Sequence, residues 1–290
     1  MSVSYILSRF VFRHPEPVSA VSFSLDRDYL FATGCSDHIA RVWSVSDGNV
    51  LSSSDNTEND ITALSFFQDT VITGHADGEV RFYRYKHSKL PHKKGTLNKL
   101  DYFTTIDCRN RHGRKSKGTR VTGLQAFSSR FNNENSKEKE YILVTTNDSR
   151  IRLCALDSFV CLYKFKGNVN HQFPIAASIN EYAKYIISGS EDNNVYIWPF
   201  EIFEQDASSV NNAVTNRLRL SGGVRKSSAY QKFQGHSSIV TCAIFAPART
   251  SSICRNFDVD MNTKYRDSPL KGGIIVTAGF DGHIHVFEMG

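Results

Sequence analysis

Residues 187–198 read ISGSEDNNVYIW, and this stretch decides the fold. Small and apolar residues lead to Asp192, and a second run, in which apolar and polar residues alternate, ends at Trp198. Alternation with a period of two on both sides of a short polar turn is typical of a β-hairpin. The same order of strand, turn aspartate and strand recurs in four other places, where the aspartates are Asp37, Asp77, Asp148 and Asp281.

The five hairpins belong to a longer repeat. Six residues after each aspartate stands an apolar or aromatic residue, namely Trp43, Tyr83, Cys154, Trp198 and Phe287. A strand pattern precedes every hairpin and another follows most of them, so each repeat predicts four strands. Successive aspartates are 40, 71, 44 and 89 residues apart, and two of these spacings match the period of about 40–45 residues of a propeller blade. We therefore predict an all-β propeller of four-stranded antiparallel blades, with about five blades visible.

The repeat also predicts how the whole chain is organised. Residues 1–290 are expected to form one domain, with an N-terminal strand over residues 4–12. The expected blades cover residues 13–55, 59–110, 119–167, 172–235 and 236–290. Each blade has an apolar stripe that it cannot bury alone, so we expect neighbouring blades to stabilise one another.

Two features of the repeats resemble the WD-repeat β-propeller family. They are the dipeptide Gly235-His236 ahead of the last hairpin, and the six-residue interval from aspartate to tryptophan that ends at Trp43 and again at Trp198. The resemblance implies a structural tetrad of a histidine, a hydroxyl residue on the second strand, the turn aspartate and the tryptophan. The implied members are His236, Thr277 and Asp281 in the last repeat, with Phe287 in place of tryptophan, and Ser188, Asp192 and Trp198 in the fourth.

Longer stretches resemble one branch of that family more closely. Residues 106–124, 142–153 and 188–198 look like the Rab-binding, rabphilin-11-like WD-repeat proteins. This resemblance implies a non-catalytic scaffold for protein partners, among them a small Rab-type GTPase. It also implies a cytoplasmic protein that works peripherally on endosomal or Golgi-derived membranes. Members of the family are expected to have seven blades, so either the first blades lie outside this chain or the ring closes with fewer.

Composition narrows the class of protein. The chain has 290 residues, 40% of them hydrophobic, and a net charge of +6. Length and apolar content suffice for a large core and argue against a disordered chain. No apolar run of about 18 residues occurs, and the N-terminus lacks the apolar block of a signal peptide. The six cysteines include no C-x-x-C pair, which favours a reduced, cytoplasmic protein.

Positive charge is concentrated between residues 86 and 120, where eleven lysines and arginines face two aspartates. We expect its second half to cross from the outer strand of the second blade to the inner strand of the third. The candidate partner-binding residues are Arg109, Arg111, Arg114, Lys115, Lys117 and Arg120. Such a segment can dock an acidic protein surface or anionic lipid, or it can be a solvated loop without a partner. RNA binding is a weaker alternative, because no nucleic-acid-binding motif accompanies the charge, and we expect no nucleic-acid partner.

Other motifs are incomplete. Residues 113–120 superficially look like a phosphate-binding loop, but Thr119 occupies the lysine position and a strand follows instead of a helix. The pair His283 and His285 has metal-capable spacing without a third ligand nearby, so no metal is expected. No nucleophile elbow or H-E-x-x-H motif is present. The sequence therefore predicts no enzymatic activity and no cofactor.

Overall fold

A computed structural model describes residues 10–86, 98–109, 119–129, 138–199, 224–247, 250 and 273–289. Every element whose bounds this part of the chain gives is a β-strand, which confirms the all-β class. The described residues contain no helix with the length and apolar character needed to cross a membrane. The chain divides into two compact units, residues 1–121 and 122–290.

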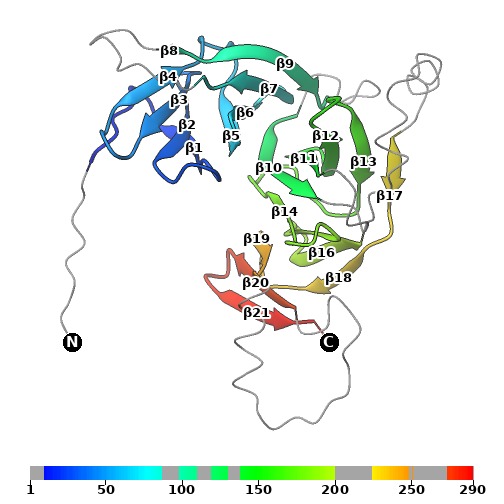
Figure 1. Ribbon diagram of the computed structural model, residues 1–290. Coiled ribbons are helices and arrows are strands. Elements are labelled where there is room, and N and C mark those ends of the chain that lie inside the picture. The colour runs from blue at the N-terminus through cyan, green and yellow to red at the C-terminus, as the bar shows by residue number, and fades with distance from the viewer. Residues whose placement is uncertain are drawn as a thin grey trace, which may run out of the picture. The chain divides into compact units, whose positions relative to one another are not determined.

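The first unit contains two sheets (Figure 1). The first sheet has the order β1 (Val18–Phe23), β2 (Leu30–Cys35), β3 (Ala40–Ser44), β4 (Val50–Ser53), β8 (Asn98–Lys99). The second has the order β5 (Ile61–Phe67), β6 (Thr70–His75), β7 (Glu79–Arg84), β9 (Asp101–Asp107). Strand β9 pairs antiparallel with β7, as expected for the outer strand of the second blade.

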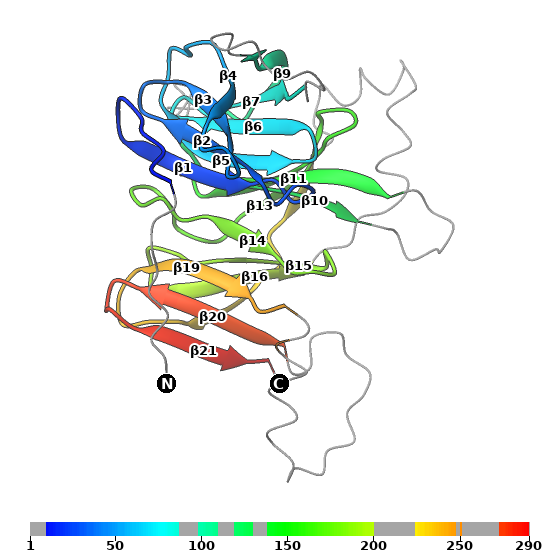
Figure 2. The same ribbon diagram turned by 60° about the vertical axis from the view of Figure 1, so that its left-hand side comes forward.

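The second unit contains three sheets, of which the last is seen in Figure 2 as β19, β20 and β21 side by side. The third sheet consists of β10 (Val121–Ser129), β11 (Lys139–Thr146), β12 (Arg150–Ala155), β13 (Cys161–Phe165) and β17 (Arg225–Ser227). The fourth consists of β14 (Ala177–Ile179), β15 (Tyr185–Ser188), β16 (Asn194–Pro199) and β18 (Gln231–Gln234). The fifth has, among the described residues, β19 (Val240–Phe245), β20 (Ile274–Gly279) and β21 (Ile284–Glu288).

Apolar side chains of neighbouring sheets pack together in one cluster in the first unit and in two clusters in the second. In the first unit, Leu30 and Val42 of the first sheet pack with Ile61 and Phe66 of the second. In the second unit, Trp198 of the fourth sheet packs with side chains of the third, among them Leu153 and Phe165. Gly34 of β2 lets the first and second sheets come close together, because a side chain at this position would collide with Ile61 of β5. The packing explains why each repeat depends on its neighbour.

Two short strands depart from the predicted blades. Strand β8 pairs parallel with β4, and β17 pairs parallel with β13. Each comes from a long excursion between the third and fourth strands of one sheet, and it covers the outer edge of the preceding sheet before the chain returns. Covering an edge hides backbone groups that would otherwise invite another strand. Strands of two or three residues carry no periodicity, so the sequence could not predict them.

The start of the chain differs from the prediction as well. Of the expected strand over residues 4–12, only residues 10–12 are described, and they form no strand. Phe12 instead packs edge-on against Phe31 and Trp43, with ring centroids 4.9 and 5.4 Å apart. Its position is therefore held by aromatic contacts with the first sheet, and a pattern of alternating apolar residues does not distinguish that from pairing in a ladder.

Candidate functional site

The five turn aspartates lie in equivalent hairpins, between the second and third strands of each sheet. The residue that follows each aspartate has left-handed backbone geometry, with φ of 65° at His38, 89° at Gly78, 60° at Ser149, 68° at Asn193 and 78° at Gly282. In four of the turns the aspartate carboxylate accepts a hydrogen bond from the backbone N–H two residues later, at Ile39, Glu79, Asn194 and His283. Aspartate is favoured here because its side chain completes the turn.

The last sheet brings three of the implied tetrad residues together. The Nδ1–H of His236 donates to the Asp281 carboxylate at 2.9 Å, and His236 Nε2 accepts a hydrogen bond from the Thr277 hydroxyl at 2.8 Å. Burial opposes ionisation of Asp281, but hydrogen bonds from His283 N–H, His236 and Ser237 hold its pKa well below the usual range. Phe287, at the tryptophan position, makes no part of this network and packs on Phe233 at 4.8 Å.

The first sheet contains a histidine that sequence reasoning missed. His14 Nε2 accepts a hydrogen bond from the Thr33 hydroxyl at 2.8 Å, and Trp43 Nε1–H donates to the same Thr33 oxygen at 2.8 Å. His14 lies four residues before β1, as His236 lies four residues before β19. That spacing could have identified it, although Arg13 stands where the last repeat has glycine. Asp37 takes no part and instead pairs with Arg41 at 2.6 Å.

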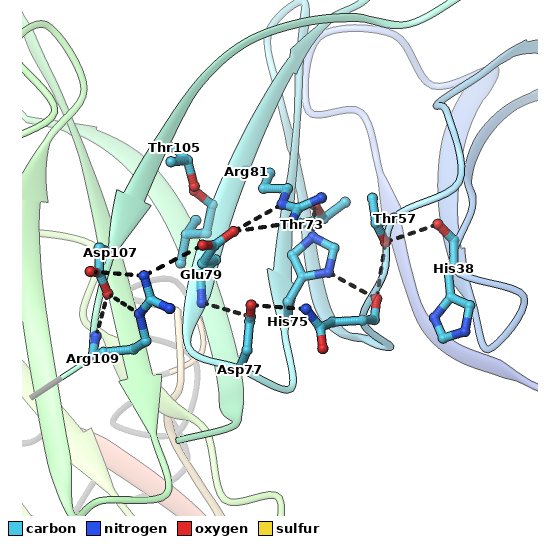
Figure 3. A network of polar contacts seen from close by, with 12 residues as sticks. His38, Thr57, Thr73, His75, Asp77, Glu79, Arg81, Thr105, Asp107 and Arg109 are labelled. Atoms are coloured by element: carbon cyan, nitrogen blue, oxygen red, sulfur yellow. Dashed lines mark hydrogen bonds and ion pairs between the residues drawn. The ribbon is translucent and has the colours of Figure 1, made fainter. Parts of the chain in front are cut away.

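The second sheet supplies its histidine from within the second strand. The Nδ1–H of His75 donates to the Asn59 carbonyl at 3.2 Å, and His75 Nε2 accepts from the Thr73 hydroxyl at 2.8 Å (Figure 3). The Asn59 amide in turn donates to Asp77 at 2.9 Å. Burial lowers the pKa of His75, so its imidazole is neutral at pH 7.

The fourth sheet has the implied residues without the implied network. Ser188 donates to the Gly189 carbonyl at 2.8 Å, and the Trp198 indole donates to the Lys166 carbonyl at 2.9 Å. Asp192 accepts from the Tyr196 hydroxyl at 2.7 Å. The tetrad implied for this repeat does not form, because none of the described histidines links Ser188 to Asp192, and each of the three side chains has another partner.

The third sheet buries an ion pair at its turn. Arg152 donates to Asp148 at 3.1 Å and to the Thr146 hydroxyl at 2.6 Å, and Thr146 donates to Asp148 at 2.5 Å. The side chains of Arg152 and Asp148 are only 6% and 1% exposed. Position four after the aspartate holds Arg41, Arg81, Arg152, Tyr196 and His285 in the five repeats. This position contacts the turn carboxylate in three of them, while Arg81 pairs with Glu79 and His285 stacks on His236.

Residues 109–120, the second half of the positively charged stretch and called the basic segment below, begin at the turn of the second sheet and return to it at Thr119. A side chain on Gly78 would lie 3.2 Å from Arg109 Cγ and 2.9 Å from the Thr119 carbonyl, and Cys108 N–H donates to the Gly78 carbonyl at 3.0 Å. Residues 109 and 119 therefore both meet the Asp77 turn. Arg111, Arg114, Lys115 and Lys117 lie outside the described residues. Arg120 is exposed just ahead of β10.

Arg109 forms ion pairs with carboxylates of its own unit. Its guanidinium lies 2.8 Å from Asp107 and 3.6 Å from Glu79, while its side chain is 38% exposed (Figure 3). The ion pair with Asp107 raises the pKa of Arg109, with Glu79 adding a smaller effect. The sequence predicted an exposed cation for partner binding, and the geometry shows one that also anchors the start of the basic segment.

Comparison with known families identifies the repeat. The family model described as WD domain, G-beta repeat matches residues 7–44 and 159–199. Two stretches of the chain therefore match the WD40 repeat. WD repeat-containing protein 44 of Xenopus laevis is 32% identical over 95% of this chain and 28% of that protein. The 2-deoxy-glucose resistant protein 2 of Saccharomyces cerevisiae is 29% identical over 76% of this chain and 26% of that protein. This chain thus spans less than a third of either relative.

The fold also has a solved counterpart. The computationally designed Ika8 protein is 17% identical, with a TM-score of 0.55 over 95% of this chain and 59% of that one, which is a likeness of fold alone. WD40-repeat proteins generally act as scaffolds for protein interactions. Within the described residues, no group of three or more His, Cys, Asp or Glu is placed to hold a metal ion. His283 is exposed beside Asp281, and His285 stacks on His236.

Proposed function

We propose that this WD40-repeat chain is a non-catalytic scaffold that binds a protein partner through the turn end of its second sheet, where the basic segment of residues 109–120 begins and ends. One observation carries the proposal: Arg109 and Thr119 both pack against Gly78 of the Asp77 turn. Both ends of the segment therefore lie at the turn end of the second sheet.

Charge argues for a partner with an acidic surface. Residues 109–120 contain six lysines and arginines and no acidic residue. Of the six, Arg109 has carboxylate neighbours in Asp107 and Glu79, and these neighbours do not balance the remaining five. Five cations in so short a segment attract an acidic surface and speed its association.

The partner that we propose to test first is a small Rab-type GTPase, on cytoplasmic faces of endosomal or Golgi-derived membranes. The support is the resemblance of residues 106–124, 142–153 and 188–198 to Rab-binding WD-repeat proteins. The first of these stretches contains the basic segment, and the second lies in the third sheet. A Rab in its GTP-bound form would be captured in a nucleotide-dependent way, which distinguishes it from a nonspecific acidic protein.

The test compares matched charge reversals. Arg114→Glu and Lys115→Glu are each set against Lys184→Glu, an exposed lysine in the turn between β14 and β15. Each basic-segment variant is expected to weaken binding of an immobilised GTP-loaded Rab at least about fivefold, or about 1 kcal/mol. Lys184→Glu is expected to leave binding unchanged. Equal binding by all three variants would reject the basic segment as the partner surface.

The same cations suit a second class of ligand, because basic clusters attract anionic membranes at about 1 kcal/mol per residue. The observation that favours this alternative is the eleven lysines and arginines within residues 86–120. Vesicles with and without phosphatidylserine test it, and an unstructured RNA tests nucleic-acid binding. A steep loss of RNA binding with salt would indicate the RNA alternative. Binding to phosphatidylserine vesicles without any Rab would indicate the membrane alternative.

A further inference from the structure

Two cysteines of the third sheet lie opposite each other. Cys154 of β12 and Cys161 of β13 are Cα partners in an antiparallel pair. Directly opposite residues of such a pair have side chains on the same face and Cα atoms about 4.5–5.5 Å apart. Disulfides span Cα separations of about 4.4–6.8 Å, so this register suits a cross-strand bridge. In this structure both residues are thiols.

The pair occupies the end of the hairpin. Ala155 N–H donates to the Val160 carbonyl at 3.0 Å and so closes the turn that joins β12 to β13. The ladder shifts register between Leu153 and Cys154, which brings Cys161 rather than Leu162 opposite Cys154. A register shift of one residue redirects a side chain to the other face. The shift is therefore what aligns the two sulfurs.

Cys154 and Cys161 differ in burial and in the charges near their sulfurs, which suits them to different steps of a thiol oxidation. Cys154 is fully buried, whereas Cys161 is partly exposed. The Cys154 thiol, a hydrogen-bond partner of Cys161, lowers the pKa of Cys161 most, and the charges of Arg152 and Lys164 lower it further against the effect of burial. A partly exposed thiol with positive neighbours is the more reactive one, and a buried thiol in contact with it can resolve the product.

We propose that Cys161 and Cys154 form a redox-active pair that a hydroperoxide converts reversibly into a disulfide across β12 and β13. The Cys161 thiolate attacks the terminal peroxide oxygen, the O–O bond breaks, and hydroxide or an alkoxide leaves. Cys161 becomes a sulfenic acid. The Cys154 sulfur then attacks the sulfenic sulfur, the S–O bond breaks, and water leaves with the proton of the Cys154 thiol. The peroxide gains two electrons and the two thiols lose them, and a dithiol reductant reverses the change.

The sequence allows a sharp readout. Trypsin cleaves after Arg152 and after Lys164, so both cysteines fall within the single peptide 153–164, whereas every other cysteine falls in a separate peptide. After the folded protein is treated with dilute hydrogen peroxide and then with N-ethylmaleimide, this peptide is expected to lose two hydrogens and to take up no maleimide. Dithiothreitol is expected to restore two reactive thiols.

Cys242 is the internal comparison. It is more exposed than Cys161, but burial raises the pKa of its thiol. If exposure alone determined reactivity, Cys242 would oxidise first. We expect the 153–164 peptide to oxidise several-fold faster, because the pKa of Cys161 is lowered and that of Cys242 is raised, and the thiolate is the form that reacts. In guanidinium chloride, where the register is lost, the preference is expected to disappear.

Variants complete the test. Cys154→Ser is expected to leave a sulfenic acid on Cys161 that dimedone traps, and Cys242→Ser is expected to form the disulfide as the parent does. The proposal is overturned if the parent's peptide 153–164 keeps both thiols while Cys242 is oxidised. It is also overturned if Cys161 reacts but links only to another chain. Both outcomes are read on the unsubstituted protein, so they do not depend on the folding of a variant.

Discussion

Removing the arginine from the buried ion pair of the third sheet should destabilise its unit far more than removing it from the equivalent pair of the first sheet. Arg152 and Asp148 are 6% and 1% exposed, and Arg41 and Asp37 are 14% and 13% exposed. Arg152→Met removes one partner and leaves the Asp148 carboxylate buried, which costs about 3–5 kcal/mol. Arg41→Met is expected to cost about 1–2 kcal/mol, because water can still reach Asp37.

The two tryptophans make this measurable in each unit separately. Trp43 lies in the first unit and Trp198 in the second, and the chain has no others. Urea unfolding followed by fluorescence in a Trp43→Phe background therefore reports the second unit, and in a Trp198→Phe background the first. Asp148→Asn added to Arg152→Met removes the stranded charge and should recover at least about 1 kcal/mol. An Arg152→Met cost no larger than that of Arg41→Met, or no recovery in the double variant, would refute the reasoning.

Three further predictions concern the remaining sheets. Asp192→Ala should lower the free energy of unfolding of the second unit by about 1–3 kcal/mol, because the Tyr196 hydroxyl and the Asn194 N–H lose their acceptor. Asp192→Asn keeps an acceptor oxygen and should lower it less. Thr277→Val keeps the shape of the side chain but leaves His236 Nε2 without its donor, and should cost about 1–3 kcal/mol by urea unfolding, whereas Thr241→Val, at a part-buried site, should cost less. The pKa of His75 is lowered by burial, so below pH 6.5 the unfolded chain binds a proton that the folded state does not, and the stability of the first unit should fall between pH 7 and 5. A His75→Gln variant with an equally steep pH dependence would contradict that assignment.

The sequence by itself determined the strands and the turns of the five repeats. Alternation of apolar and polar residues specifies a strand locally, and an aspartate followed by a residue that tolerates positive φ specifies the turn. Gly78 and Gly282 supply that residue without strain, and His38, Ser149 and Asn193 adopt the same geometry. These signals act within a few residues, so they can be recognised even in repeats that lack the other residues of the pattern.

Only the tertiary structure decided which side chains meet. Thr33 is reached by a histidine from before β1, Thr73 by one from its own strand, and Ser188 by none of the described histidines. The meeting of Arg109 with Glu79, and of Cys154 with Cys161, depends on how strands pair and on a one-residue shift of register. Apart from the four-residue interval that separates His14 from β1 and His236 from β19, the spacing of these residues does not recur from repeat to repeat. Hydrogen bonds and thiol contacts form only within a few ångströms. The pairing of strands determines how far apart these side chains lie. Within each unit, that pairing is set by the packing of one sheet on the next.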